Sequence, residues 1–355
     1  MRVVMVTGGA GFIGANLTHQ LLDEDHDTRV VVYDALTYAG NLDNIEGRIG
    51  PRCVFERGDI CDGARVADVL RRHRPHHIFH LAAESHVDRS IDGPGAFVRT
   101  NVQGTFEMLE AARGHYYAEL SPAERASFRF IHVSTDEVYG SLGAEGAFRE
   151  TTPYAPNSPY AASKAAADHL ARAYHVTYRL PVITTNCSNN YGPHQFPEKL
   201  IPLVILNAIE GRPLPVYGDG ANTRDWLFVG DHARALRRVA AEGRVGETYN
   251  VGGRAERTTL EVVRAVCAAL ETERPRRTGR YEDLITFVED RPGHDFRYAI
   301  DPTKLETELG WTATMAFAPG ISTTVRWYLE HEAWCERIHT GTYRRERLGL
   351  DGGDG

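Results

Sequence analysis

The sequence of 355 residues lacks three features that would each assign it to a class: a long apolar run, a paired-cysteine motif and an excess of positive charge. No apolar stretch approaches the ~18 residues that a membrane-spanning helix needs. The N-terminal stretch 3–6 ends at glycines and lacks the length and cleavage pattern of a signal peptide. We therefore expect no membrane span and no secretory leader.

The five cysteines, at positions 53, 61, 187, 267 and 335, are odd in number and widely spaced, which is typical of reduced thiols in a cytoplasmic protein. The formal net charge of -8 and the pI of about 6.1 argue against a general polyanion binder. We therefore expect no nucleic-acid partner, although a local basic pocket could still hold a phosphate group.

The order of apolar runs and helical stretches predicts the fold class. Apolar runs alternate with helical stretches through the first half, which is typical of a doubly wound, parallel Rossmann-type α/β sheet. Strands are predicted at 3–6, 29–33, 53–56, 77–82, 128–134 and 182–186, and helices at 12–22, 96–113 and 160–178. After about residue 192 the pattern loosens. There we expect a smaller α/β substrate-binding lobe with a helix at 200–210, a strand at 214–217 and a helix at 232–241, while residues 248–251 can return to the large sheet. The domains are placed at 1–191 and 192–343, followed by a flexible tail, 344–355.

A glycine-rich loop follows the first predicted strand. Gly8, Gly11 and Gly14 stand at three-residue intervals before a helix, where they permit a tight turn and a close approach of backbone to a pyrophosphate. Asp34 ends the next strand, twenty residues after Gly14, where a carboxylate accepts hydrogen bonds from an adenine ribose. The following Ala35, Leu36 and Thr37 supply no cation for a 2′-phosphate, so NAD is favoured over NADP. Asp59 and Ile60, after the third strand, suit the border of the adenine or an ordinary turn equally well.

Tyr160 and Lys164 lie at i and i+4, on one face of an alanine-rich predicted helix. An ammonium group at that distance lowers the pKa of a phenol, and with a positive nicotinamide it makes the tyrosine a usable base. Alone, this spacing is also what a solvated helix shows by chance. Its position in a chain with the glycine loop favours catalysis.

Thr135, Asp136 and Glu137 follow a strand whose carboxyl end faces the crevice where ligands bind in such sheets. If burial keeps one carboxyl protonated while the other stays ionised, the pair supplies an acid and a base together. A solvated turn acid beside a helix cap is the alternative interpretation. Oxidation followed by loss of water is the chemistry that the whole set suits.

A group of histidines, His73, His76, His77 and His80, does not have the spacing of a metal site with neighbouring Cys or carboxylate ligands, and we expect no metal. The adjacent residues 71–74 have the composition of a solvated helix end.

These motifs together resemble the extended short-chain dehydrogenase/reductase superfamily, and within its nucleotide-sugar branch the family of dTDP-glucose 4,6-dehydratases. Nearly the whole chain takes part in the resemblance. The matching stretches are TGGAGFIG, LAAESHVDRS, STDEVYG, YAASK, NCSNNYGPHQFPEKLIPL, LPVYGDGANTRDWLFVGDHARAL and EDRPGHDFRY. The resemblance implies a hydro-lyase that uses NAD and works as a homodimer.

The resemblance also implies a role for each reacting residue. Tyr160 would take the proton of the sugar 4-hydroxyl as hydride leaves carbon 4, with Thr135 hydrogen-bonding that oxygen and Lys164 holding the cofactor ribose. Glu137 would remove the proton on carbon 5, and Asp136 would protonate the departing 6-hydroxyl. Hydride returned to carbon 6 would then complete a dehydration that regenerates NAD.

Binding residues are implied in the same way. Near NAD the resemblance places Gly8, Gly11, Phe12, Ile13, Gly14, Asp34, Ala35, Leu36, Thr37, Asp59, Ile60, Leu81, Ala82, Ala83, Glu84, Ser85, Thr100, Tyr160, Lys164 and Asn190. Near the nucleotide-sugar substrate it places Ser85, Thr135, Asn189, Lys199, Leu200, Pro215, Val216, Tyr217, Arg224, Arg291 and His294. Thr259 stands where the family commonly has asparagine, so one nucleotide contact is not carried over.

Several alternatives stay open at this point. A nucleotide-sugar 4-epimerase or decarboxylase would use the same hydride but leave carbon 6 hydroxylated, and a non-catalytic NAD-sensing protein could share the fold. The sequence does not decide between dTDP and UDP, nor which pathway uses the product. The helices at 96–113 and 160–178 would pair two subunits, yet their amphipathic faces also suit packing within a monomer.

Overall fold

The computed structural model describes residues 1–290 and 295–341. Its main sheet is built from β1 (Arg2–Thr7), β2 (Thr28–Asp34), β3 (Cys53–Arg57), β4 (His77–His80), β5 (Arg129–Thr135), β6 (Val182–Cys187) and β10 (Thr248–Val251). The strand order is β10-β6-β5-β4-β1-β2-β3, and every neighbouring pair is parallel. The order reverses at β1, so the carboxyl ends of β1 and β4 border the crevice where such sheets bind ligands.

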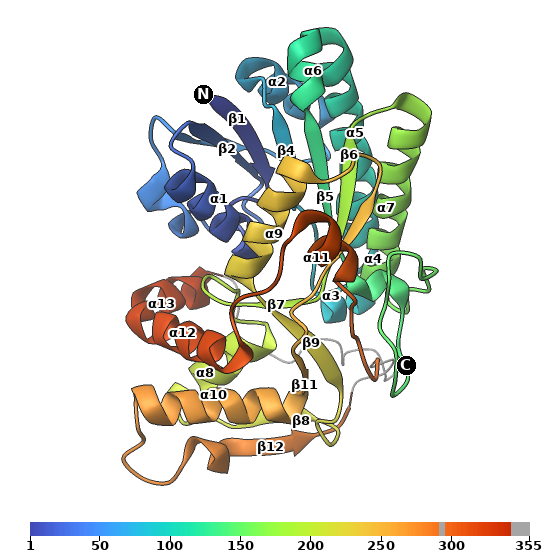
Figure 1. Cartoon of the computed structure of the whole chain (residues 1–355). Coiled ribbons are helices and arrows are strands. Elements are labelled where there is room, and N and C mark those ends of the chain that lie inside the picture. Colours follow the sequence, from blue (N-terminus) through green and yellow to red (C-terminus); the bar gives the residue numbers. More distant parts are fainter. Residues whose placement is uncertain (291–294, 342–355) are drawn as a thin grey trace.

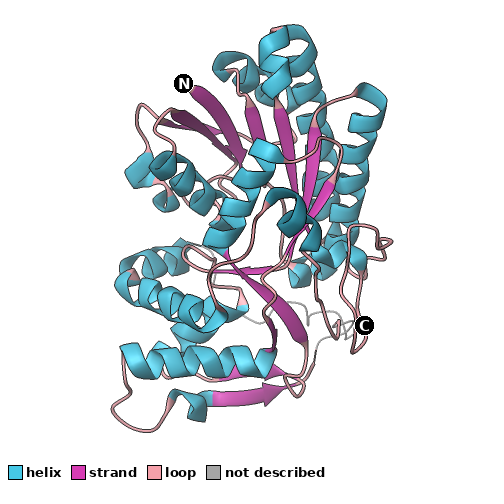
Figure 2. Ribbon diagram, viewed as in Figure 1, coloured by secondary structure: helices cyan, strands magenta, loops and turns pink. Residues whose placement is uncertain are grey.

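Helices cover both faces of this sheet (Figures 1 and 2). One face carries α2 (Gly63–His73), α5 (Thr105–Gly114) and α7 (Pro159–Tyr178), and the other carries α1 (Phe12–Glu24) and α9 (Val229–Glu242). The strands are buried on both faces, which explains why they appear in the sequence as almost continuous apolar runs rather than alternating ones. The predicted Rossmann-type architecture is confirmed.

The helix predicted at 96–113 is wrong in detail. The chain forms α3 (Val87–Asp92), α4 (Pro94–Phe97), a π-helical stretch η3 (Val98–Gly104) and then α5. The wider turn contains Asn101, whose side-chain amide accepts from the Glu84 N–H at 2.8 Å and donates to the Ser163 hydroxyl at 2.8 Å. Single π turns often occur at functional sites, and this one joins the loop after β4 to α7.

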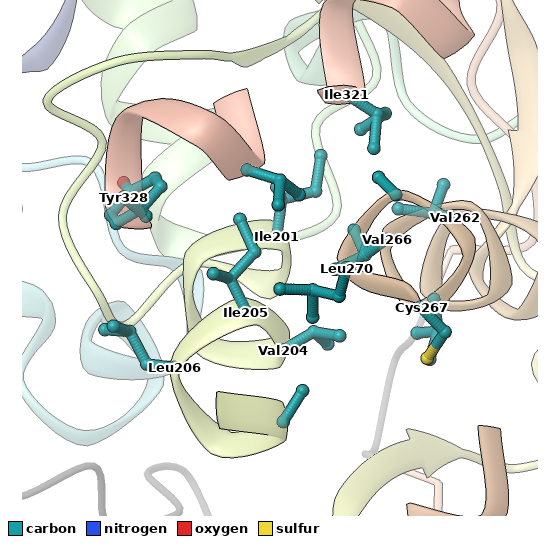
Figure 3. Packing of buried hydrophobic residues seen from close by; sticks show 14 of the residues in the cluster. Ile201, Val204, Ile205, Leu206, Val262, Val266, Cys267, Leu270, Ile321 and Tyr328 are labelled. Atoms are coloured by element: carbon teal, nitrogen blue, oxygen red, sulfur yellow. The ribbon is translucent and has the colours of Figure 1, made fainter. Parts of the chain in front are cut away.

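The second half of the chain builds most of a smaller lobe. It contains a three-stranded sheet of β7 (Asn189–Tyr191), β9 (Thr223–Phe228) and β11 (Glu256–Thr258), and a pair formed by β8 (Leu214–Tyr217) and β12 (Ile285–Val288). Its helices are α8 (Leu200–Ile209), α10 (Thr259–Glu273), α12 (Phe317–Glu330) and α13 (Glu332–Gly341). Figure 3 shows the core of this lobe, where side chains of α8, α10 and α12 meet.

Part of the second half returns to the large sheet. We predicted a helix at 232–241 in the substrate lobe; α9 instead begins at Val229 and packs Ala233, Leu236 and Ala240 beside α1. β10 joins β6, as the sequence allowed, and α11 (Thr303–Leu309) packs against it. The division at residue 191 stays a prediction about where ligands bind, and the predicted tail lies outside the described residues.

Shorter elements complete the described chain. They are η1 (Leu42–Asn44), η2 (Glu46–Arg48), η4 (His115–Glu119), α6 (Pro122–Ser127), η5 (Asp136–Tyr139) and η6 (Tyr281–Leu284). All five cysteines fall within the described residues as thiols rather than disulfides, and four of them are buried. Across the described residues, none of the helices combines the length and apolarity that crossing a bilayer requires.

Candidate active site

A cleft of about 340 Å³ opens at the carboxyl edge of the large sheet. Its walls come from the loop between β1 and α1, the ends of β2 to β6, and α7. The predicted residues that line it are Gly8, Gly11, Phe12, Ile13, Gly14, Asp34, Ala35, Thr37, Asp59, Ile60, Leu81, Ala82, Ala83, Glu84, Ser85, Thr100, Thr135, Glu137, Tyr160, Lys164, Asn189, Asn190 and Lys199. The fold thus brings the glycine loop, the tyrosine–lysine pair and one of the two carboxyls to a single cleft.

Two glycines in the first loop permit contacts that no other residue could make. Gly8 has φ +67°, and a Cβ there would lie 2.8 Å from the backbone nitrogen of Ala82. A Cβ on Gly14 would lie 2.2 Å from the carbonyl oxygen of Gly8. The backbone therefore closes tightly at the start of α1, whose N-terminal N–H groups are the kind that bind a pyrophosphate.

Asp34 ends β2 at the cleft and is almost fully buried. Its carboxylate accepts the N–H groups of Ala10, at 3.0 Å, and Leu36, at 2.8 Å, and burial raises its pKa. Leu36 adopts φ +56° and is not among the described residues that line the cleft. Asp59 lines the cleft more openly, 3.6 Å from the Arg99 guanidinium.

Tyr160 and Lys164 project from the first turns of α7, which begins where the Ser158 hydroxyl accepts the N–H of Ala161. Both side chains are buried, and the Lys164 ammonium group donates to the Val133 carbonyl at 2.9 Å. We expected the lysine to lower the pKa of the tyrosine. Among the described residues, burial, reinforced by Glu137, raises the pKa of Tyr160 well above its ordinary value. The lowering expected from the lysine together with a positive nicotinamide stays a prediction.

The adjacent carboxyls occupy different environments, because β5 ends at Thr135 and η5 begins at the next residue. Glu137 lines the cleft, whereas Asp136 is only 2% exposed. Thr135 joins them: its hydroxyl donates to Asp136 Oδ1 at 3.4 Å and accepts the Glu137 N–H at 3.3 Å. Burial, then the charges of Glu137 and Asp225, raise the pKa of Asp136 well above its ordinary value. This shift favours the protonated form of Asp136.

One atom of this group is unsatisfied. Asp136 Oδ2 is buried and has no hydrogen-bond partner among the described residues. A buried polar atom without a partner is costly, and such atoms often await a ligand.

The predicted substrate residues divide into two sets. Ser85, Asn189 and Lys199 line the cleft, and Lys199 donates to the Ser85 carbonyl at 2.9 Å. The described cleft lining does not include Leu200, Pro215, Val216, Tyr217 or Arg224, and the Val216 side chain is fully buried in the core of the smaller lobe. Arg291 and His294 lie outside the described residues.

Arg224 lies on β9, away from the cleft lining. Its guanidinium donates to the carbonyl groups of Thr223 at 2.8 Å and Asp295 at 3.0 Å, and lies 4.4 Å from the centre of the Tyr298 ring. The charge of Arg224 also acts on Asp136, whose pKa it lowers against the larger effect of burial. β9 therefore supplies a cation whose field reaches the acid at the end of β5.

Sequence reasoning missed several residues that line the cleft: Tyr33, Ala39, Gly40, Gly58, Val133, Ser134, Cys187, Ser188, Gln195, Phe196 and Glu198. Glu198 is the most unusual, because its almost fully buried carboxylate lies 3.5 Å from Arg89 and 3.7 Å from His86. Burial raises its pKa. The local sequence did not indicate a role for Glu198, because an acid beside Lys199 has the pattern of a surface ion pair.

Three of the four clustered histidines have separate hydrogen-bond partners. His73 contacts Glu56 at 2.7 Å, His76 accepts the N–H of Val3, and His80 lies between the hydroxyls of Thr7 and Thr105. Within the described ranges, no three His, Cys, Asp or Glu side chains converge as a metal site would require.

The chain is similar to known nucleotide-sugar enzymes over almost its whole length. Residues 5–324 match the family model described as GDP-mannose 4,6 dehydratase. A dTDP-glucose 4,6-dehydratase of Xanthomonas campestris is 59% identical over 98% of this chain and 99% of its own length. One of Neisseria meningitidis is 56% identical with the same coverage.

Solved structures give the same grouping. A dTDP-glucose 4,6-dehydratase of Streptomyces venezuelae with NAD bound is 46% identical, covers 95% of this chain and 99% of its own, and has a TM-score of 0.86. One of Bacillus anthracis in complex with NAD is 44% identical, with coverages of 95% and 100% and a TM-score of 0.84. A UDP-glucose 4-epimerase of Thermus thermophilus is 31% identical, covers 93% and 99%, and has a TM-score of 0.80.

Proposed function

The chain belongs to the GDP-mannose 4,6 dehydratase family, and within it we infer that the chain is a dTDP-glucose 4,6-dehydratase, a hydro-lyase that uses NAD. Its reaction converts dTDP-glucose to dTDP-4-keto-6-deoxyglucose. The related dehydratases are 44–59% identical to it, whereas the epimerase of the same fold is 31% identical. This difference favours dehydration over epimerisation.

The division of labour between Asp136 and Glu137 is the observation that carries the proposal. An epimerase or a simple oxidoreductase needs the tyrosine and the lysine, but it does not need a second acid and a second base. Here one carboxyl is buried, with a raised pKa that favours its protonated form, while its neighbour faces the same cleft as Tyr160. Elimination of water requires that combination, because one proton must be removed and another delivered.

The described residues fit NAD. The loop formed by Gly8 and Gly14 leaves no space for a Cβ, and the buried Asp34 stands at the end of β2 where a ribose hydroxyl would donate. The cations among the described lining residues are Lys164 and Lys199, from α7 and from the residue before α8. Neither lysine lies in the segment after β2, where the 2′-phosphate of NADP would need a cation.

We assign the protein's part of the reaction as follows. When bound, NAD accepts hydride from carbon 4 and returns it to carbon 6, and its positive ring favours the ionised form of a nearby phenol. Tyr160 receives the proton of the 4-hydroxyl, while Thr135 hydrogen-bonds that oxygen and Lys164 holds the ribose. The ketone acidifies carbon 5, whose proton Glu137 removes. Asp136 protonates the departing 6-hydroxyl, which leaves as water.

The nucleotide end of the substrate has two candidate cations among the described residues. Lys199 lines the cleft, and Arg224 lies on β9 in the smaller lobe. Both suit a diphosphate, and the guanidinium of Arg224 offers paired donors. The preference for dTDP over UDP follows from the relatives rather than from a contact in the cleft.

The proposal is tested by incubating the purified protein with dTDP-glucose deuterated at carbon 4, and separately with UDP-glucose. Dehydration lowers the product mass by about 18 units, whereas epimerisation leaves it unchanged. The deuterium is expected in the new methyl group. A product of unchanged mass, or a dehydrated product that has lost the label, would contradict the proposal.

We further propose that the enzyme is a homodimer in the cytoplasm. In support, Val98, Phe106, Val176 and Tyr178 are between 41% and 57% exposed on η3, α5 and α7, the segments that the family resemblance suggests for pairing. Light scattering of wild-type protein and of Phe106→Asp tests the pairing. We expect a dimer that the variant weakens, and a wild-type monomer would contradict this. The five cysteines that remain thiols support a reducing compartment.

A further inference from the structure

A buried carboxylate on α7, the helix that carries Tyr160 and Lys164, has no role in the mechanism above. Asp168 is one helical turn after Lys164 on α7 and is 5% exposed. It accepts three hydrogen bonds of 2.9 Å each, from the Ser134 hydroxyl, the Tyr154 hydroxyl and the ring of His132. Ser134 directly precedes Thr135. The carboxylate therefore connects the helix carrying the lysine to the strand end carrying the catalytic threonine and acids.

A chain of polar side chains holds this carboxylate in place. Asn186 on β6 donates to the hydroxyls of Tyr154, at 3.2 Å, and Tyr139, at 2.9 Å. Tyr139 in turn donates to the Asn250 amide oxygen on β10, at 2.9 Å. Because the three groups that donate to Asp168 come from β5 and from the segment before α7, the network joins these elements to α7 around the carboxylate.

The hydrogen-bond donors around this carboxylate are a buried ring and two hydroxyls. Its ion-pair partner is His132, whose pKa burial lowers, so the ring is neutral at working pH. Ser134 and Tyr154 are neutral donors. The same carboxylate raises the pKa of Lys164, which lies one turn earlier on α7.

The buried ammonium group of Lys164 is the group on which this carboxylate acts. Burial lowers the pKa of its ammonium group, and the largest opposing effect is the carboxylate of Asp168 on the same helix. From the strands packed against α7, the thiol of Cys187 on β6 acts in the same sense, while the rings of His80 on β4 and His132 on β5 face the lysine and would repel it if protonated. Tyr160 shares the lysine's helical face.

We propose that Asp168 is a positioning residue for the dehydratase reaction: its carboxylate keeps the Lys164 ammonium group charged and ties the Thr135 end of β5 to α7. This proposal rests on the proposed function, because Asp168 acts through Lys164, the residue to which that function assigns the binding of the cofactor ribose. A merely structural carboxylate would stabilise the fold without affecting the lysine.

The pH dependence of kcat distinguishes these roles. Lys164 loses its proton as pH rises, and Asp168→Asn removes the charge that delays this loss. The basic limb of the kcat profile is therefore expected to move to lower pH by about one pH unit, a typical effect of one charge near a buried group. The matched control is Asp231→Asn, a buried aspartate of α9 that accepts the N–H groups of Thr314 and Met315. It is expected to lower the melting temperature without moving that limb.

Three further variants complete the test. Tyr154→Phe removes one hydrogen bond but keeps the charge, so the limb is expected to stay in place, whereas Asp168→Glu is expected to return the limb part of the way toward its wild-type position. Asp168→Ser, which leaves room for a water molecule, replaces the asparagine variant if that one fails to fold. The proposal is refuted if the basic limb of Asp168→Asn coincides with that of the wild type, even where kcat itself falls.

A second readout needs neither substrate nor turnover. The chain has three lysines, Lys164, Lys199 and Lys304. Trace acetylation across a pH series, read by peptide mass spectrometry, reports where each amine loses its proton. In Asp168→Asn, Lys164 is expected to react at lower pH while Lys304, which pairs with Glu247, is unchanged. An unchanged Lys164 profile refutes the role of Asp168. Failure of wild-type protein to dehydrate dTDP-glucose would refute only the proposed function.

Discussion

Replacing Asp136 by asparagine is expected to separate oxidation of the sugar from loss of water. The substitution keeps the side-chain shape, and its amide oxygen can still accept the Thr135 hydroxyl. The neutral amide also matches the protonated form of the carboxyl, which burial favours by raising the pKa of Asp136. What it removes is the proton that the carboxyl can release to the 6-hydroxyl.

The size of the effect follows from the burial of the acid. A positioned general acid contributes about 10²–10⁴ in rate. Asp136 is 2% exposed, so water has little access to replace it as a proton donor. We therefore expect a loss of about 10³–10⁴ in dehydration, or about 4–5.5 kcal/mol of barrier.

Rapid mixing with dTDP-glucose provides the assay. Absorbance of the reduced nicotinamide is expected to appear at the wild-type rate and then to persist, while the dehydrated product accumulates slowly. Asp231→Asn again serves as the control for loss of a buried carboxyl and is expected to show neither effect. Dehydration within about tenfold of wild type, or absorbance that fails to appear at all, would show that Asp136 is not the acid of the elimination step.

Other substitutions test the remaining roles. Tyr160→Phe is expected to abolish the transient absorbance, because no group is left to take the 4-hydroxyl proton; a normal transient would remove Tyr160 from that role. Glu137→Gln is expected to slow dehydration by about 10²–10⁴ while NAD affinity, measured by calorimetry, is retained, and unchanged turnover would contradict this. Gly14→Ala places a Cβ 2.2 Å from the Gly8 carbonyl and is expected to abolish NAD binding, so wild-type affinity would be the contrary result. Finally, the pKa of Asp136 is higher in the folded state than in the unfolded state. As pH rises above ~4, the free energy of unfolding of the wild type is therefore expected to fall relative to that of Asp136→Asn. The expected slope is about 1.4 kcal/mol per pH unit until the pH passes the folded-state pKa. A difference in urea unfolding that does not vary with pH would rule this out.

Local patterns in the sequence were sufficient for much of the large domain. The buried strands produce continuous apolar runs, and the glycine spacing is dictated by the tight turn before α1, so both could be recognised without tertiary information. The lysine spacing in α7 follows from helical geometry alone. The assignment of α9 failed because its amphipathic pattern shows that one face is buried but not against which sheet.

For the acids and the lysine, the sequence determined only which groups stand side by side. The burial of Asp136, the exposure of Glu137 to the cleft and the hydrogen bond of Lys164 to Val133 depend on packing between β5, α7 and β9. A pKa in a folded protein is set by desolvation and by charges brought together from distant segments. The sequence therefore determined the reacting groups and their order, and the tertiary structure decided which of them are buried and in which direction burial moves their pKa.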